Sequence, residues 1–148
     1  MPSVAPATTA DLVRVKKSEA RLYLMQRGVQ FASFHVVFGP HPEGTKVRQG
    51  DGRTPEGRYV LDARNPHSSF YKSLHVSYPN AEDRRRASRL GAAPGGDIMV
   101  HGQPNGWGAY AAVTQRTNWT LGCIALSNED MDVVWDSVPV GTPIEIEP

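Results

Sequence analysis

The sequence predicts a single, mostly β domain that carries one or two short helices. Its 148 residues match the length of one domain rather than two. Fourteen glycines and twelve prolines make up 26 of the 148 residues, a larger share than the average of ~12%. This composition favours short strands joined by many turns. Hydrophobic residues supply 39% of the chain, which is too much for a disordered protein.

The first part of the chain is predicted to form a meander of three strands. Residues 1–10 lack an apolar pattern and are expected to be a flexible lead, with the folded domain spanning 11–148. Alternating apolar and polar side chains predict strands over residues 12–16 and 21–25. After a short turn, aromatic and β-branched residues predict a third strand over 30–38.

The middle of the chain combines a long loop with short elements. Glycine and proline cluster between residues 39 and 57, which predicts a loop region. Short strands are expected over 58–61 and 74–78. Asn80 then provides a cap for a helix over 81–90.

The last third is predicted to contain three strands and one helix. Short apolar runs indicate strands over 97–100 and 123–126. A helix is expected over 129–137, because acidic residues in its first turn suit the helix dipole. A final strand follows over 141–146.

Composition excludes several classes of protein and site. A net charge of +1 gives no global field toward nucleic acid or acidic membranes. The single cysteine rules out an internal disulfide and a cysteine-rich zinc site. No stretch reaches the ~20 apolar residues of a membrane span. The first ten residues lack the basic and apolar regions of a signal peptide, so export requires a signal already removed or another route.

Cys123 and His101 are the candidate reactive pair. Each lies at one end of an apolar strand beside a glycine, Gly122 before the cysteine and Gly102 after the histidine. A cysteine needs a neighbouring base to become a good nucleophile at neutral pH, and imidazole can supply it. Gly122 allows the backbone to curl into an oxyanion hole, and the Gly102 carbonyl can fix the tautomer of the imidazole. The alternative is an inert core cysteine, because free cysteines are often buried.

The remaining histidines are weaker candidates for chemistry. His67 is expected in a loop and His75 in a strand, where single histidines usually have structural roles. Together with His101 and Cys123 they could form a zinc site, but no HxH or HExxH spacing supports one. We therefore expect no metal.

The chain resembles the L,D-transpeptidases, the YkuD-type family of bacterial cell-wall enzymes. A strand, His-Gly, a glycine-rich loop and Thr-x-Gly-Cys-Ile follow one another in the family's order, and the resemblance covers about residues 12–146. One branch of the family shares the Trp-Thr-x-Gly-Cys motif. The matching segments are Gly50-Asp51-Gly52-Arg53-Thr54-Pro55-Glu56-Gly57, Ser77-Tyr78-Pro79-Asn80, Ile98-Met99-Val100-His101-Gly102-Gln103-Pro104-Asn105 and Asn118-Trp119-Thr120-Leu121-Gly122-Cys123-Ile124-Ala125.

The resemblance implies a β-sandwich-like fold and a cysteine acyltransferase. Cys123 would attack the carbonyl of the third residue of a peptidoglycan stem peptide, usually diaminopimelate, and D-Ala would leave. His101 would be the general base. An amine acceptor would resolve the thioester as a 3→3 cross-link or an amine exchange, and water would give carboxypeptidase activity.

The resemblance also implies the surroundings of this reaction. Gly122 and Cys123 would form the oxyanion hole, and Gly102 would orient the histidine. Tyr78, Trp119 and Thr120 lie in the matching motifs and are expected to contact substrate. Members of the family need no cofactor. We expect a monomer in the periplasm or cell envelope, whose partner is the stem peptide rather than nucleic acid.

Two positions depart from the common family pattern and keep alternatives open. Leu121 replaces a histidine found before the nucleophile in many members, and Ala125 stands where a polar residue often falls. These departures suit a non-catalytic peptidoglycan-binding module with the same fold. A papain-like cysteine peptidase or amidase is a further alternative, but there the cysteine precedes the histidine, which is the reverse of the order here.

Overall fold

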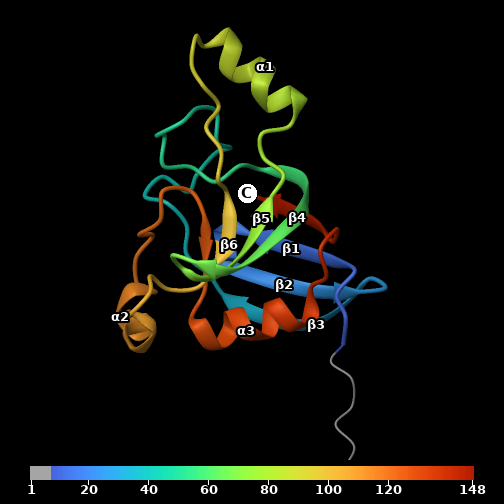
Figure 1. The fold of residues 1–148 in the computed structure, drawn as a ribbon. Coiled ribbons are helices and arrows are strands. Elements are labelled where there is room, and N and C mark those ends of the chain that lie inside the picture. The colour runs from blue at the N-terminus through green and yellow to red at the C-terminus, as the bar shows by residue number, and fades with distance from the viewer. Residues whose placement is uncertain (1–7) are drawn as a thin grey trace, which may run out of the picture.

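Eight strands form one mixed sheet in the computed structural model, which describes residues 8–148 (Figure 1). Their order across the sheet is β3-β2-β1-β8-β4-β5-β6-β7, so the last strand in sequence lies near the middle. The strands are β1 (Leu12–Lys16), β2 (Arg21–Gln26), β3 (Val29–His35), β4 (Gly57–Ser68), β5 (Tyr71–Val76), β6 (Met99–His101), β7 (Ile124–Ala125) and β8 (Pro143–Glu147).

The sheet folds over itself at β4, which confirms the sandwich-like architecture. The first part of this twelve-residue strand pairs with β8 and the remainder pairs with β5, so one strand belongs to both halves. The two ends of the sheet meet again beyond β3, where Val37 and Ala125 exchange backbone hydrogen bonds of 3.1 and 3.0 Å. A core packed between the two halves follows from this closure.

The N-terminal meander forms as predicted, and β8 completes it. Strands β1, β2 and β3 pair antiparallel in sequence order, while β1 pairs in parallel with β8. Alternation along β1 and β8 turns one face of each strand inward, as the sequence pattern requires. The fully buried side chains of these elements include Val13, Val15, Leu22, Leu24, Ile144 and Ile146.

Two predicted helices are confirmed, and the structure adds short ones. Helix α1 (Ala81–Arg89) begins at Asn80, whose side chain and that of Asp83 form a capping box. Helix α3 (Asn128–Ser137) begins at Ser127 and adds its apolar face to the core. Figure 1 shows α1 standing off the sheet on the connection between β5 and β6. The added elements are α2 (Ala111–Thr114) and the 3₁₀ turns η1 (Lys17–Glu19) and η2 (Gly108–Tyr110).

The predicted loop around His67 is wrong, because β4 continues through it. Its last residues pair with β5 across register shifts, and these accommodate Pro66 inside a strand. A proline can lie in a strand where the ladder is already irregular, since its missing N–H then costs little. His67 is therefore on a strand, as His75 is on β5.

The predicted flexible lead falls largely on residues 1–7, which lie outside the described residues. Ala10, which ends that predicted lead, is buried, and its N–H donates to the Ser137 carbonyl at 2.8 Å. Within residues 8–148, no helix combines the length and apolar character needed to cross a bilayer.

Candidate active site

A cavity of about 820 Å³ opens where β6 and β7 meet the long loop over residues 39–56. Among its lining residues are Cys123, His101, Trp119 and Thr120, four of the residues that the sequence singled out. Parallel pairing of β6 with β7 accounts for this meeting, because it brings the strand that ends at His101 beside the strand that follows Cys123.

His101 is held with its Nε2 free to accept a proton. The ring is buried, and its Nδ1 lies 2.7 Å from the Gly102 carbonyl oxygen. A carbonyl can only accept, so Nδ1 carries the hydrogen and Nε2 keeps its lone pair. Burial lowers the pKa of His101, more than the Gly102 contact raises it. The imidazole is therefore neutral at neutral pH and suited to act as a base.

Aromatic rings enclose the imidazole. Phe70 stacks on His101 with ring centroids 4.5 Å apart and planes 24° from parallel. Trp119 lies at 5.8 Å from the same ring, and its indole N–H donates to Gln115 at 3.1 Å. These rings restrict the orientation of the imidazole and keep water from one side of it.

Cys123 is partly exposed in the cavity, and its thiol donates to the Asp97 carbonyl at 3.3 Å. Burial raises the pKa of this thiol, a hydrogen bond from the Met99 backbone opposes the rise, and the Asp97 charge adds to it. The resting sulfur is therefore a neutral thiol, which needs a base before it can attack.

The turn before Cys123 is fixed by its own hydrogen bonds. The Gly122 N–H donates to the Thr120 hydroxyl at 3.1 Å, and that hydroxyl donates to the Cys123 carbonyl at 2.8 Å. Among residues 8–148 the Cys123 N–H has no backbone acceptor. Of the two N–H groups predicted for an oxyanion hole, that of Gly122 is thus occupied by Thr120, and that of Cys123 is available.

Gly122 has a conformation and a position that only glycine fits. Its φ is +134°, outside the range that side chains favour. A Cβ there would lie 2.6 Å from the Arg53 carbonyl oxygen. The turn therefore packs directly on the loop over residues 39–56.

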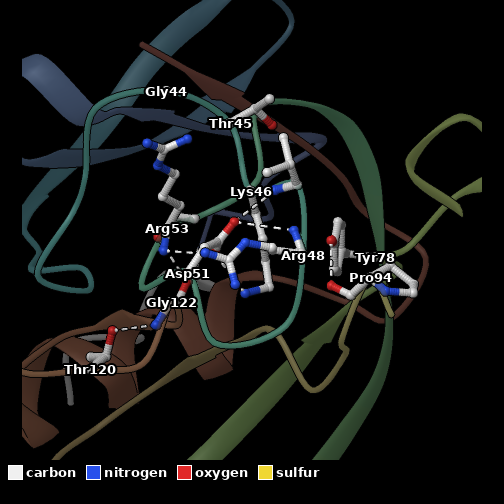
Figure 2. A network of polar contacts seen from close by, with 12 residues as sticks. Gly44, Thr45, Lys46, Arg48, Asp51, Arg53, Tyr78, Pro94, Thr120 and Gly122 are labelled. Atoms are coloured by element: carbon white, nitrogen blue, oxygen red, sulfur yellow. Dashed lines mark hydrogen bonds and ion pairs between the residues drawn. The ribbon is translucent and has the colours of Figure 1, made fainter. Parts of the chain in front are cut away.

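Asp51 organises that loop from within (Figure 2). Its carboxylate accepts from the Lys46 ammonium at 3.0 Å and from three backbone N–H groups, those of Val47, Arg48 and Arg53, at 2.8 to 3.2 Å. Burial raises the pKa of Asp51, but these hydrogen bonds outweigh it and hold the pKa below its usual value. A charged Asp51 thus fixes the wall against which Gly122 packs.

Tyr78, predicted to contact substrate, does not line the cavity. It is 3% exposed, its ring packs edge-on against Tyr59, and its hydroxyl donates to the Pro94 carbonyl at 2.7 Å (Figure 2). Burial raises the pKa of Tyr78 to about 12. In this position it supports the segment that leads to Gly95, Gly96 and Asp97 in the cavity wall.

The histidines weighed for a zinc site do not gather with Cys123 as a set of metal ligands among residues 8–148. His75 lies 2.6 Å from the Asp62 carboxylate through its Nδ1. Across the part of the chain that the structure describes, no three His, Cys, Asp or Glu residues are grouped as metal ligands.

A sequence model of YkuD, the L,D-transpeptidase catalytic domain, matches residues 10–146, almost the whole chain. The chain belongs to the YkuD family. The curated protein "Putative L,D-transpeptidase YafK" of Escherichia coli K12 is 36% identical over 74 residues, 49% of this chain and 28% of that protein.

Solved structures share the YkuD fold over nearly the full length. The helical cell shape determining protein Pgp2 of Campylobacter jejuni superimposes with a TM-score of 0.68 at 24% identity, covering 92% of this chain and 46% of that one. The L,D-transpeptidase of Xylanimonas cellulosilytica gives 0.62 at 17% identity, with coverages of 99% and 64%. The chain spans less than a third of YafK and about half of Pgp2.

Sequence reasoning missed several residues that shape this YkuD cavity. Phe70 precedes β5 and carries no motif that announces its stacking on the imidazole. Gln103 is fully buried and donates to Gln115 at 2.9 Å and to the Leu126 carbonyl at 2.8 Å. A glutamine inside a glycine-rich loop gives no local sign that it joins the end of α2 to the residue that follows β7.

Proposed function

We propose that this YkuD domain is an L,D-transpeptidase that acts on peptidoglycan stem peptides through a thioester on Cys123. One observation carries the proposal: the Cys123 thiol and the neutral His101 imidazole line the same cavity, and the Gly102 carbonyl accepts from the imidazole Nδ1. Membership of the family supports the reaction type.

The first half-reaction forms the thioester. Cys123 Sγ exchanges its hydrogen bond with the Asp97 carbonyl for one to His101 Nε2, which takes the thiol proton. Sγ attacks the carbonyl carbon of the third stem residue, diaminopimelate in the common stem, and the C–N bond to D-Ala breaks. His101 returns the proton to the departing amine, so that neutral imidazole is restored.

The oxyanion that develops during attack needs a hydrogen-bond donor. The Cys123 N–H is the available donor, and the turn fixed by Thr120 and Gly122 holds it in place. Loss of one such donor typically slows acyl transfer about 10²–10³-fold. Gly122 contributes shape rather than a free N–H, and the Gly102 carbonyl orients the base.

The second half-reaction releases the acyl group. An amine attacks the thioester carbonyl and gives its proton to His101, the C–S bond to Cys123 breaks, and the departing thiolate receives that proton. A stem-peptide amine gives a 3→3 cross-link, another amine gives exchange, and water gives a trimmed tripeptide. Trp119 and Thr120 line the cavity and are the side chains we expect against the stem. No cofactor or metal takes part, and the site of action is the cell envelope, where the polymer lies.

Muropeptide mapping tests this proposal. Purified disaccharide tetrapeptide is incubated with the protein and with its Cys123→Ala variant, and D-Ala and products are followed. We expect D-Ala release by the unaltered protein alone. Retention on insoluble peptidoglycan without turnover would replace the proposal by a non-catalytic binding module. Cleavage elsewhere in the stem would replace it by a peptidase or amidase.

A further inference from the structure

Lys17 is a buried ammonium in an unusual place, on the turn that follows β1. Its side chain is 3% exposed, and its Nζ donates to the Gly44 carbonyl at 3.0 Å and to the Thr54 carbonyl. The Glu56 carboxylate lies 3.4 Å from the same nitrogen. Two backbone carbonyls of one loop therefore accept from the ammonium, and a carboxylate of the same loop pairs with its charge.

Thr54 connects this ammonium to the nucleophile. Thr54 is fully buried, and while its carbonyl accepts from Lys17, its hydroxyl donates to the Gly122 carbonyl at 2.7 Å. Gly122 precedes Cys123 and packs on the peptide between Arg53 and Thr54. A continuous path of contacts thus runs from Lys17 through one residue to the turn that carries the sulfur.

We propose that Lys17 is a positioning residue that fixes the Cys123 turn through Thr54. This inference rests on the proposed function for its kinetic consequence. The ammonium does not touch the cavity that holds the thiol. It acts by holding the Thr54 carbonyl, so that the hydroxyl of the same residue meets Gly122 and the Cys123 N–H keeps its direction.

The charge on Lys17 is set by the groups around it. Burial lowers the pKa of Lys17, and the Glu56 carboxylate opposes this change. The Arg53 charge also lowers the pKa and the Asp51 charge raises it, so the pKa lies below its ordinary value. Glu43 and the C-terminal residue Pro148 line a small hollow on its other side, and Lys16 and Glu19 lie beside it on the chain. The neutral amine keeps two N–H donors but loses the charge that pairs with Glu56 and strengthens both hydrogen bonds, so positioning weakens as pH rises through this lowered pKa.

Acylation of Cys123 by a carbapenem, followed by mass spectrometry, tests the inference. Lys17→Met keeps the length of the side chain and removes the donors. We expect it to slow acylation about 10- to 100-fold, the range that misplaced catalytic groups typically cost. Lys16→Met is the matched control, because that neighbouring lysine is half-buried and its ammonium contacts Glu19 at 3.8 Å and the Tyr23 ring at 6.0 Å, away from Thr54. Equal rates in the two variants would overturn the inference.

Two further measurements separate positioning from a general loss of structure. Thr54→Val and Lys17→Met should be non-additive in a double-mutant cycle, because both break the same path. Lys17→Arg keeps its charge at any pH, so acylation should persist at alkaline pH where it declines in the unaltered protein. Additive effects, or identical alkaline profiles, would contradict a role through Thr54.

Hydrogen exchange distinguishes failure of the inference from failure of the proposed function. Amides of residues 120–124 should exchange faster in Lys17→Met than in Lys16→Met, whether or not the protein is an enzyme. An unaltered protein that never forms the carbapenem adduct refutes the acyl-transfer function. Unchanged exchange in both variants refutes the positioning role.

Discussion

The Thr54 hydroxyl donates a 2.7 Å hydrogen bond to the Gly122 carbonyl, across 68 residues of sequence. This contact joins the glycine-rich loop to the turn that bears Cys123, and both partners are buried. The loop is in turn held by Asp51 at one point and by Lys17 at another. The proposed active site therefore depends on a loop that contributes no reacting atom.

Thr54→Val tests that dependence. Valine keeps the shape of threonine but leaves the Gly122 carbonyl without its donor, which typically costs about 1–3 kcal/mol when the carbonyl is buried. We expect a loss of that size in urea unfolding and slower acylation of Cys123. Thr117→Val, at an exposed position, is the control and should change neither measurement. A stable Thr54→Val protein that is acylated at the normal rate would contradict the coupling.

Gly122→Ala should be among the most damaging single changes in the turn. The added Cβ meets the Arg53 carbonyl at 2.6 Å in a backbone conformation that alanine disfavours. We expect the free energy of unfolding to fall by about 2–4 kcal/mol. We also expect acylation of Cys123 to be lost. Gly28→Ala controls for positive φ, because at φ +77° its Cβ would meet nothing within 4 Å. Equal losses in the two variants would show that packing on Arg53 is unimportant.

Asp51→Asn should destabilise the protein in a pH-dependent way. The amide leaves the buried Lys46 ammonium without its counter-charge, which typically costs about 2–4 kcal/mol. The folded pKa of Asp51 lies below its unfolded value of 3.8, so its contribution is complete above that pH and is lost as pH falls through the folded pKa.

Unfolding free energies at several pH values check this expectation. The difference between the unaltered protein and Asp51→Asn should be largest near neutral pH and shrink below about pH 4. Asp136→Asn, an exposed change on α3, is the control and should show little difference at any pH. A difference that does not vary with pH would mean that the charge of Asp51 is irrelevant.

The fall of the acylation rate at low pH should follow the protonation of His101. A general base works only when neutral, and burial lowers the pKa of His101 below its ordinary value of 6.5. The rate of carbapenem acylation should therefore fall with a midpoint below pH 6.5 as the imidazole gains a proton. His41→Asn, which changes the other histidine of the cavity, should keep this midpoint. An unshifted midpoint, or one that moves in His41→Asn, would assign the fall to another group.

The sequence predicted those parts of the molecule that depend on neighbouring residues. Alternation predicted β1 and β2, and the Asn80 cap predicted the start of α1, because each is a local property. The course of β4 through Pro66 could not be foreseen, because it depends on irregular pairing with a distant strand. The same limit explains Tyr78, whose motif suggested substrate contact while packing against Tyr59 places it in the core.

The candidate site divides in the same way. Cys123 and His101 were predicted as a reactive pair from their glycine neighbours and from the order of the motifs, and both line one cavity in the structure. Lys17 and Phe70 were missed because their partners lie far along the chain. A lysine after a strand is expected to be solvent-exposed until the fold brings two carbonyls and a carboxylate to it.

Mass spectrometry of the protein mixed with tetrapeptide stems tests the central claim most directly. The account predicts a transient adduct on the peptide that contains Cys123, with the mass of the stem acyl group after loss of D-Ala. It should be absent in Cys123→Ala. A thiol that stays unmodified while D-Ala is released, or while nothing is released, would contradict the account.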